Sequence, residues 1–241
     1  MNKAESAIIY RGPSLIDQSP IVVVAIVKSS NTKTGNMVQT YILSDNGLDP
    51  MMNNKLGHDF SICGNCKYRG EAVSIDAPGK HAKGRKCYVK LFHGPLLVWK
   101  HLQKNGYPTI KGHAAIALLG ADRMVRIGTY GDGAAVPRYI WDSLISEAIG
   151  HTAYSHQSDL EGVEVDPSLY MISADSEKEA RVYWDKGQRT FRVGNSVDDI
   201  VKGFEALCPA SKEGGRRSTC KDCKLCSGSD LKAKSIFIQA H

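Results

Sequence analysis

The second half of the chain alternates short apolar runs with segments of helical spacing, and this alternation restricts the fold more than any other feature. Apolar and β-branched residues predict strands in "MVRIGTYGD" (Met124–Asp132) and "SLYMISAD" (Ser168–Asp175). Helical spacing follows in "VPRYIWDSLISEAIG" (Val136–Gly150) and "SEKEARVYWDKG" (Ser176–Gly187). Strands that alternate with helices form parallel βα units. We therefore predict an α/β fold built as a partial (β/α) barrel, with a doubly wound open sheet as the alternative.

The first half of the chain is less regular. The continuous apolar run "IVVVAIVKSS" (Ile21–Ser30) predicts a strand that is buried on both faces. A polar turn, "NTKTGN", connects it to Met37–Leu43, which alternates like a hairpin partner. Residues 44–90 are rich in loop-forming residues, and Gly94–Gly106 has helical spacing with a closing glycine. We expect the first 20 residues to form a loosely structured lead-in.

Length and composition predict one soluble domain over residues 1–241. Hydrophobic residues make up 42% of the 241 residues, which is enough to bury a sizeable core. We find no run of about 18 apolar residues and no secretion signal, so we expect a cytoplasmic protein without a membrane partner. The net charge of +6 permits an anionic partner without requiring one.

Seven cysteines fall into two groups, in polar segments that are far apart in the sequence. A reducing compartment keeps thiols free, and an odd number of cysteines in two clusters argues against a disulfide framework. Clustering in Lys-rich loops also differs from the burial that is typical of a structural cysteine. We therefore predict metal binding. The N-terminal group consists of Cys63, Cys66 and Cys87, and the C-terminal group consists of Cys208, Cys220, Cys223 and Cys226.

The C-terminal group has the C-x2-C-x2-C spacing that wraps a [4Fe–4S] cluster, in Cys220, Cys223 and Cys226. Cys208 precedes a proline, as a distant ligand of such a cluster often does, so it is the expected fourth ligand. Thiolate sulfur also binds zinc, and a zinc ion would serve only to crosslink the loops. We favour the iron–sulfur cluster and keep zinc as the alternative.

The N-terminal group contains one C-x2-C pair and an isolated Cys87. A zinc site here would need a fourth ligand from elsewhere in the chain. Three thiolates on an iron–sulfur cluster would instead leave one iron open for a substrate or cofactor. In either case we expect one or two metal sites in the protein.

Three polar residues follow predicted strands and are expected to line a substrate or cofactor pocket: Asp132, His156 and Asp175. The C-terminal ends of barrel strands form the active face of such folds, so residues far apart in the sequence meet there. We expect both cysteine groups to converge above the same edge. The simpler alternative is that the two aspartates cap helices and that His156 bonds a neighbour.

Two basic segments flank the cysteines, at residues 80–86 and 212–217. They could steady an anionic cluster or contact a nucleic acid backbone. Aromatic residues are not interleaved with them, so a stacking platform for single strands has little support. A zinc-stapled nucleic-acid-binding or structural protein is therefore the alternative to an iron–sulfur protein with an unknown substrate or redox partner.

Several motifs together resemble an uncharacterised family that is encoded largely by bacteriophages and is similar to radical-SAM enzymes. They span nearly the whole chain and include "SICGNCKYRG", "RIGTYGDGAAVP", "YSHQ" and "CPASKEGGRRSTCKDCKLCSG". The resemblance implies a radical-SAM-like partial barrel with an iron–sulfur cluster, acting in the cytoplasm of an infected bacterium, and S-adenosylmethionine as a possible cofactor. Radical-SAM enzymes carry C-x3-C-x2-C after the first strand, whereas this chain has C-x2-C and the distant Cys87. Either a rearranged loop presents three thiolates, or the cluster lies on the C-terminal group.

Overall fold

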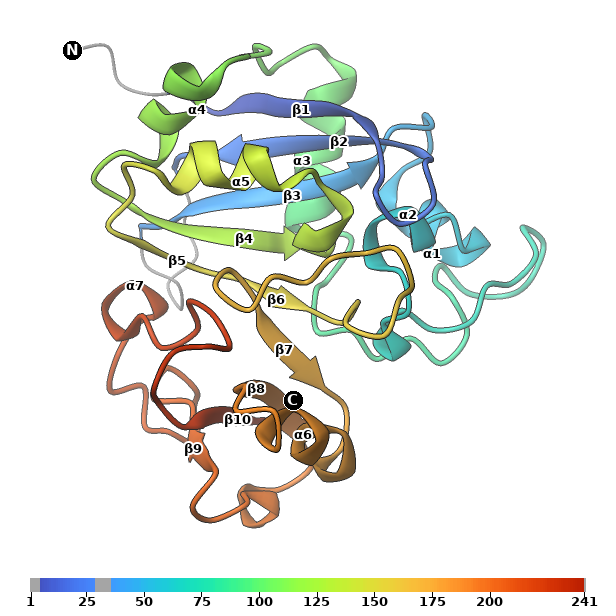
Figure 1. Cartoon of the computed structure of the whole chain (residues 1–241). Helices are drawn as coiled ribbons and strands as arrows, with labels where there is room; N and C mark the ends of the chain where they lie inside the picture. Colours follow the sequence, from blue (N-terminus) through green and yellow to red (C-terminus); the bar gives the residue numbers. More distant parts are fainter. Residues whose placement is uncertain (1–4, 29–35, 241) are drawn as a thin grey trace.

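The computed structural model describes residues 5–28 and 36–240 of the chain. It is a mixed α/β structure with two five-stranded sheets (Figure 1). The first sheet has the order β1-β2-β3-β4-β5 and the second has the order β6-β7-β8-β10-β9. The strands are β1 (Ala7–Pro13), β2 (Pro20–Ile26), β3 (Val38–Ser44), β4 (Met124–Tyr130), β5 (Gly150–Thr152), β6 (Tyr154–Ser155), β7 (Met171–Ala174), β8 (Thr190–Gly194), β9 (Glu205–Leu207) and β10 (Ser235–Gln239).

The first sheet is built around β2, whose residues Ile21–Ala25 are completely buried. Strand β2 pairs antiparallel with β1 and with β3, while β3, β4 and β5 run parallel to one another. A strand that is covered on both faces needs a continuous apolar sequence, and "IVVVA" supplies it. The predicted buried strand and its hairpin partner are therefore confirmed within the described residues.

The second sheet is entirely parallel. It begins where the first sheet ends, because β5 and β6 are separated only by Ala153. The segment 150–155 pairs with β4 over its first half and with β7 over its second half. Across both sheets, the parallel strands therefore lie in the order β3, β4, β5/β6, β7, β8, β10 and β9.

Helices cover both faces of the first sheet. Helix α5 crosses in front of the sheet in Figure 1, and α3 lies behind it. Helix α6 packs against β7 and β8 of the second sheet. The helices are α1 (Pro50–Leu56), α2 (Phe60–Cys63), α3 (Gly94–Gln103), α4 (His113–Gly120), α5 (Arg138–Ile145), α6 (Glu177–Trp184) and α7 (Cys220–Cys223), with 3-10 turns η1 (Lys67–Arg69), η2 (Gly133–Ala135) and η3 (Val197–Asp199).

A buried ion pair connects the central strand β8 of the second sheet with its edge strand β9. The Arg192 guanidinium on β8 donates to both carboxylate oxygens of Glu205 on β9, at 2.8 and 2.6 Å. Arg192 also lies over the ring of Phe237 on the intervening strand β10, at 4.8 Å from its centroid. A bidentate, desolvated pair of this kind fixes geometry, and the loss of one partner would leave an uncompensated buried charge.

The architecture corrects several expectations. The residues expected to form a lead-in contain strand β1, and Ala7, Ile8 and Ile9 on it are buried against the core. Helix α5 ends at Ile145, and Gly150 begins strand β5 instead of closing the helix. The polar turn "NTKTGN" lies mostly outside the described residues.

The α/β class is confirmed, but no closed barrel forms in the described part of the chain. Strand β10 inserts between β8 and β9, so the strand order departs from the sequence order at the end of the second sheet. Across the described residues, no helix is both long enough and apolar enough to cross a membrane.

Candidate metal centres

The predicted pocket residues meet at the ends of three neighbouring parallel strands. Asp132 follows β4, His156 follows β6 and Asp175 follows β7. The backbone N–H of His156 donates to Oδ2 of Asp132 at 2.8 Å, and the imidazole Nε2 lies 3.4 Å from Oδ1 of Asp175. The structure therefore brings the three residues together, as the strand assignments predicted.

Asp132 holds the strand ends in position. Its carboxylate accepts hydrogen bonds from the Ala134 N–H at 3.0 Å, the Ser155 hydroxyl at 3.1 Å and the Gln157 amide at 3.0 Å, besides the bond from His156. The side chain is only 7% exposed. With this many donors already bound, Asp132 acts as a structural acceptor, which agrees with the simpler alternative for this residue.

The Cys63–Cys66 turn packs directly against the end of β6. The Gln157 amide donates to the carbonyl oxygen of Cys63 at 2.8 Å and its Oε1 accepts from the Asn65 N–H at 3.0 Å. A Cβ atom at Gly64 would lie 2.0 Å from Oε1 of Gln157, so only glycine allows this approach. Gln157 is completely buried, and it joins the cysteine turn to the strand ends.

Backbone hydrogen bonds place Cys87 beside the Cys63–Cys66 turn. A two-stranded bridge between Glu71 and Lys83 closes the intervening loop, and the Cys87 N–H donates to the Tyr68 carbonyl at 2.9 Å. Burial raises the pKa of the Cys63 thiol well above its usual value, and the nearby Asp59, Cys66 and Cys87 raise it further. The N-terminal group is thus assembled, with its three thiols within electrostatic range of one another.

His156 belongs to this neighbourhood. Its imidazole Nε2 faces Asp175, and the ring interacts with the side chain of Cys66. Burial opposes protonation, but these two partners outweigh it and raise the pKa of His156 well above 6.5. The Tyr68 ring stands edge-on to the imidazole, with centroids 6.0 Å apart, and burial followed by the Asp175 charge raises the pKa of Tyr68 to about 12.

The C-terminal group is also assembled, around Cys226. Burial raises the pKa of its thiol to about 12; a hydrogen bond with Tyr154 lowers it, and the charges of Cys208, Cys220 and Cys223 raise it. Cys226 is therefore within electrostatic range of the other three cysteines of this group. All seven cysteines are partly buried.

Two arginines adjoin the C-terminal group. Arg126 lies 5.5 Å over the Tyr154 ring and interacts with Cys220 and Cys226. Arg189 interacts with Cys226 and Cys223, and it donates to the carbonyl oxygens of Leu225 at 2.8 Å and Gly228 at 3.2 Å, which flank the last cysteine. The sequence pattern did not reveal these arginines, although Arg126 was visible as a cation inside an otherwise apolar strand.

The C-terminal group lies away from the strand ends, which corrects the expectation that both groups share one edge. The Ala153 N–H, between β5 and β6, donates to the carbonyl of Cys226 at 3.2 Å. Ala153 and His156 are separated by about 10 Å along the strand, at ~3.3 Å per residue. Only Cys208, after β9, follows the end of a parallel strand. Its neighbours Cys220–Cys223 form α7, beside the first half of the 150–155 segment (Figure 1).

No ready-made metal geometry is present in residues 5–28 and 36–240, where no three His, Cys, Asp or Glu side chains are arranged to hold an ion. The thiols of each group are neighbours without standing at ligand positions. Their donor chemistry, thiol sulfur with an adjacent imidazole or arginine, nevertheless fits soft metals such as zinc and iron–sulfur clusters.

No family, curated protein or solved structure matches this chain. The comparison with family models, the comparison with curated proteins and the comparison with solved structures each found nothing significant. The assignment of function therefore rests on the geometry of the two groups.

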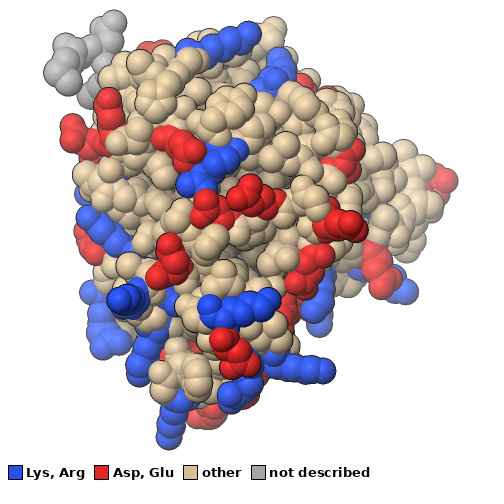
Figure 2. Space-filling model, in the orientation of Figure 1, with Lys and Arg blue, Asp and Glu red and all other residues tan. Residues whose placement is uncertain are grey.

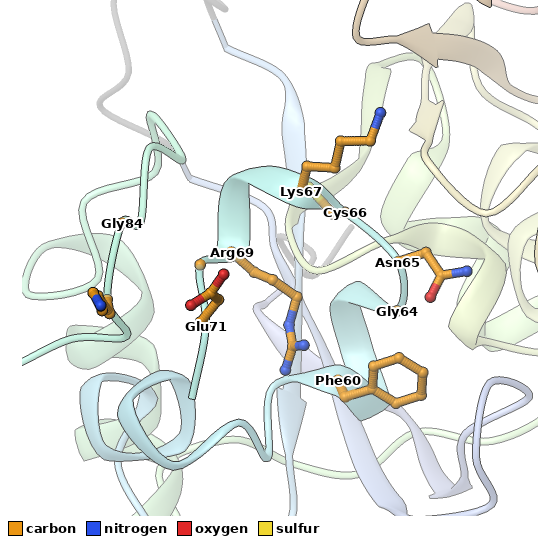
Figure 3. Close-up of a pocket in the computed structure, with 10 residues that line it drawn as sticks. Phe60, Gly64, Asn65, Cys66, Lys67, Arg69, Glu71 and Gly84 are labelled. Atoms are coloured by element: carbon orange, nitrogen blue, oxygen red, sulfur yellow. The ribbon is translucent and has the colours of Figure 1, made fainter. Parts of the chain in front are cut away.

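A hollow of about 670 Å³ opens beside Cys66 (Figure 3). Its lining includes Phe60 and the charged side chains Lys67, Arg69, Glu71 and Lys83. None of the three predicted pocket residues lines it. Arg69 is already paired with Asp59 at 2.6 Å and lies over the Phe60 ring at 5.4 Å.

The backbone conformation and the packing at position 131 both require glycine. Gly131 has φ +81°, and a Cβ there would lie 2.7 Å from Cβ of Ile42. The following helical turn η2 has only three residues, and its first amides bond to Asp132 and to the chain itself. The glycine-rich segment 128–133 is thus a tight turn.

Proposed function

We propose that the chain is an iron–sulfur redox protein whose C-terminal group binds one [4Fe–4S] cluster. The ligands would be Cys208, Cys220, Cys223 and Cys226. The observation that carries the proposal is that the Cys226 thiol interacts with all three other thiols, although Cys208 follows strand β9 and the others lie in the segment 220–226. A compact C-x2-C-x2-C turn with a fourth cysteine nearby suits a four-iron cube, provided that side-chain rotation brings the sulfurs to ligand distance.

The surroundings of this group support an anionic cluster. Four thiolates on a [4Fe–4S] core carry a net negative charge, and reduction adds one more. Arg126 and Arg189 supply positive charge beside the thiols, and positive charge favours the reduced state. The role of these arginines would be to set the potential at which the protein accepts an electron from a redox partner.

The series of parallel strands that spans the two sheets supports a radical-SAM-like, opened barrel as the scaffold. Radical-SAM chemistry needs an iron that no protein side chain occupies, and a four-cysteine cluster offers none. Electron transfer is therefore the role that we assign to the C-terminal cluster. Titration with S-adenosylmethionine, followed by calorimetry and by the EPR spectrum of the cluster, tests this role; heat release together with a changed spectrum would favour a radical enzyme instead.

The alternative zinc-stapled nucleic-acid-binding protein has less support. Basic and acidic side chains are interspersed among the described residues of the face in Figure 2, where they form no continuous basic stripe. Purification without oxygen distinguishes the two functions. An iron–sulfur protein would be brown and contain sulfide, whereas a protein with zinc at both groups would be colourless.

A further inference from the structure

The N-terminal group has three thiols but lacks the fourth ligand that a closed tetrahedral site needs. Two carboxylates near the turn are already engaged. Asp59 bonds to Arg69 at 2.6 Å and to Asn54 at 2.7 Å, and these bonds order the loop itself. Asp132 holds the strand ends through its four hydrogen bonds. His156 differs from these two carboxylates, because its imidazole interacts with the Cys66 side chain.

The fold presents His156 to the cysteine turn. The adjacent Gln157 binds the Cys63 carbonyl and the Asn65 N–H, which fixes the end of β6 against the turn. The backbone of His156 is fixed separately by Asp132. With the main chain anchored on both sides, the imidazole interacts with the Cys66 side chain.

Asp175 holds the imidazole from the other side. Its Oδ1 is buried, lies 3.4 Å from Nε2 of His156 and makes no hydrogen bond with any other described group. Its Oδ2 is 3.5 Å from Nζ of Lys67, the residue after Cys66. A metal-bound histidine typically donates its second N–H to a carboxylate in this way. With Nε2 facing Asp175, Nδ1 is the nitrogen left for a metal.

We propose that Cys63, Cys66, Cys87 and His156 form a zinc site, with Asp175 as the outer partner that orients His156. The C-x2-C pair, a distant third cysteine and a histidine from another segment make up the Cys3His set of structural zinc sites. Zinc would order a polar loop that has few apolar contacts of its own. The site is independent of the cluster proposed for the C-terminal group.

A filled fourth position has a chemical consequence. If the three thiols held an iron–sulfur cluster, one iron would remain open to a substrate. A histidine in that position closes the site, and zinc has no redox chemistry. The N-terminal group would then stabilise the fold and fix the wall of the hollow beside Cys66, leaving electron transfer to the C-terminal group.

The test is the zinc and iron content of the full-length protein, purified without oxygen, for four variants. We expect His156→Ala to lose zinc and keep its iron, and His156→Cys to recover zinc because a thiolate can replace the imidazole. We expect Asp175→Asn to weaken zinc binding by about 10–100-fold in a chelator competition, as is usual for outer-shell partners. His113→Ala, which changes an exposed histidine on α4, is the matched control and should retain zinc.

Cobalt provides a readout that does not depend on stability. Exchange of zinc for Co²⁺ should give the intense visible bands of a tetrahedral thiolate site, and the bands should move in His156→Cys. Unchanged zinc in His156→Ala would overturn the proposal. So would loss of zinc without recovery in His156→Cys, or iron in place of zinc at the N-terminal group. An iron-free C-terminal group with zinc still bound here would refute only the proposed cluster.

Discussion

Arg126 donates a hydrogen bond to the phenol oxygen of Tyr88 at 2.8 Å, and this contact connects the two cysteine groups. Tyr88 is the residue after Cys87 of the N-terminal group. The same guanidinium interacts with Cys220 and Cys226 of the C-terminal group. Arg126 is thus a fixed positive charge between two sites that we propose to be anionic.

Replacing Arg126 by Gln should lower the reduction potential of the proposed cluster. Removal of a nearby positive charge disfavours the added electron, and we expect a change of roughly 60 mV, equivalent to a tenfold change in the equilibrium constant for one electron. Potentiometric titration followed by EPR measures it. Arg181→Gln, on the exposed side of α6, is the charge-matched control. Equal potentials in the two variants would contradict the assignment.

Replacing Cys223 by Ala should strip iron and sulfide from the protein without removing zinc. The remaining three thiols would hold a four-iron cluster only weakly, and the segment 220–226 would lose its main source of order. Cys66→Ser is the matched variant in the other group, and it should remove zinc and keep iron. Iron, sulfide and zinc analysis checks both variants; full iron and sulfide retention in Cys223→Ala would disprove the ligand assignment.

Replacing Asp132 by Asn should destabilise the protein by roughly 2–4 kcal/mol. The new NH2 group would replace one carboxylate oxygen among buried donors and leave at least one of them without an acceptor. Urea unfolding measures the change. Asp142→Asn, in an exposed pair with Arg138, should change stability by less than about 1 kcal/mol. Similar costs for both variants would show that Asp132 does not fix the strand ends.

Replacing Glu205 by Ala should cost about 3–5 kcal/mol, because it leaves the buried Arg192 charge without its partner. Glu177→Ala, which breaks the exposed pair with Arg181, is the control and should cost only ~0.5 kcal/mol. Thermal or urea unfolding compares the two. A small effect at Glu205 would mean that water reaches Arg192 and that β8 and β9 are not tied together by this pair.

The sequence predicts the strands that carry their own apolar signal, such as β2 and β4. It misses β1, because "AIIYRGP" is stabilised by pairing with β2 and not by its own pattern. Local periodicity does not contain such long-range pairing.

For the candidate sites too, some features follow from the sequence and others depend on tertiary contacts. Cysteine spacing identifies both groups, and the strand ends correctly bring Asp132, His156 and Asp175 together. The partnership of His156 with Cys66 could not be predicted, because it depends on Gln157 and Gly64 meeting across two distant segments. The displacement of the C-terminal group from the strand ends depends on the bond between Ala153 and Cys226, which is likewise a tertiary contact.

The most direct test of the account is the metal and sulfide content of the wild-type chain, purified without oxygen. We predict about four iron and four sulfide per chain, as one [4Fe–4S] cluster contains, together with about one zinc. The protein should be brown, and its EPR signal should appear on reduction. A colourless protein with about two zinc and no sulfide per chain would contradict the assignment of the C-terminal group.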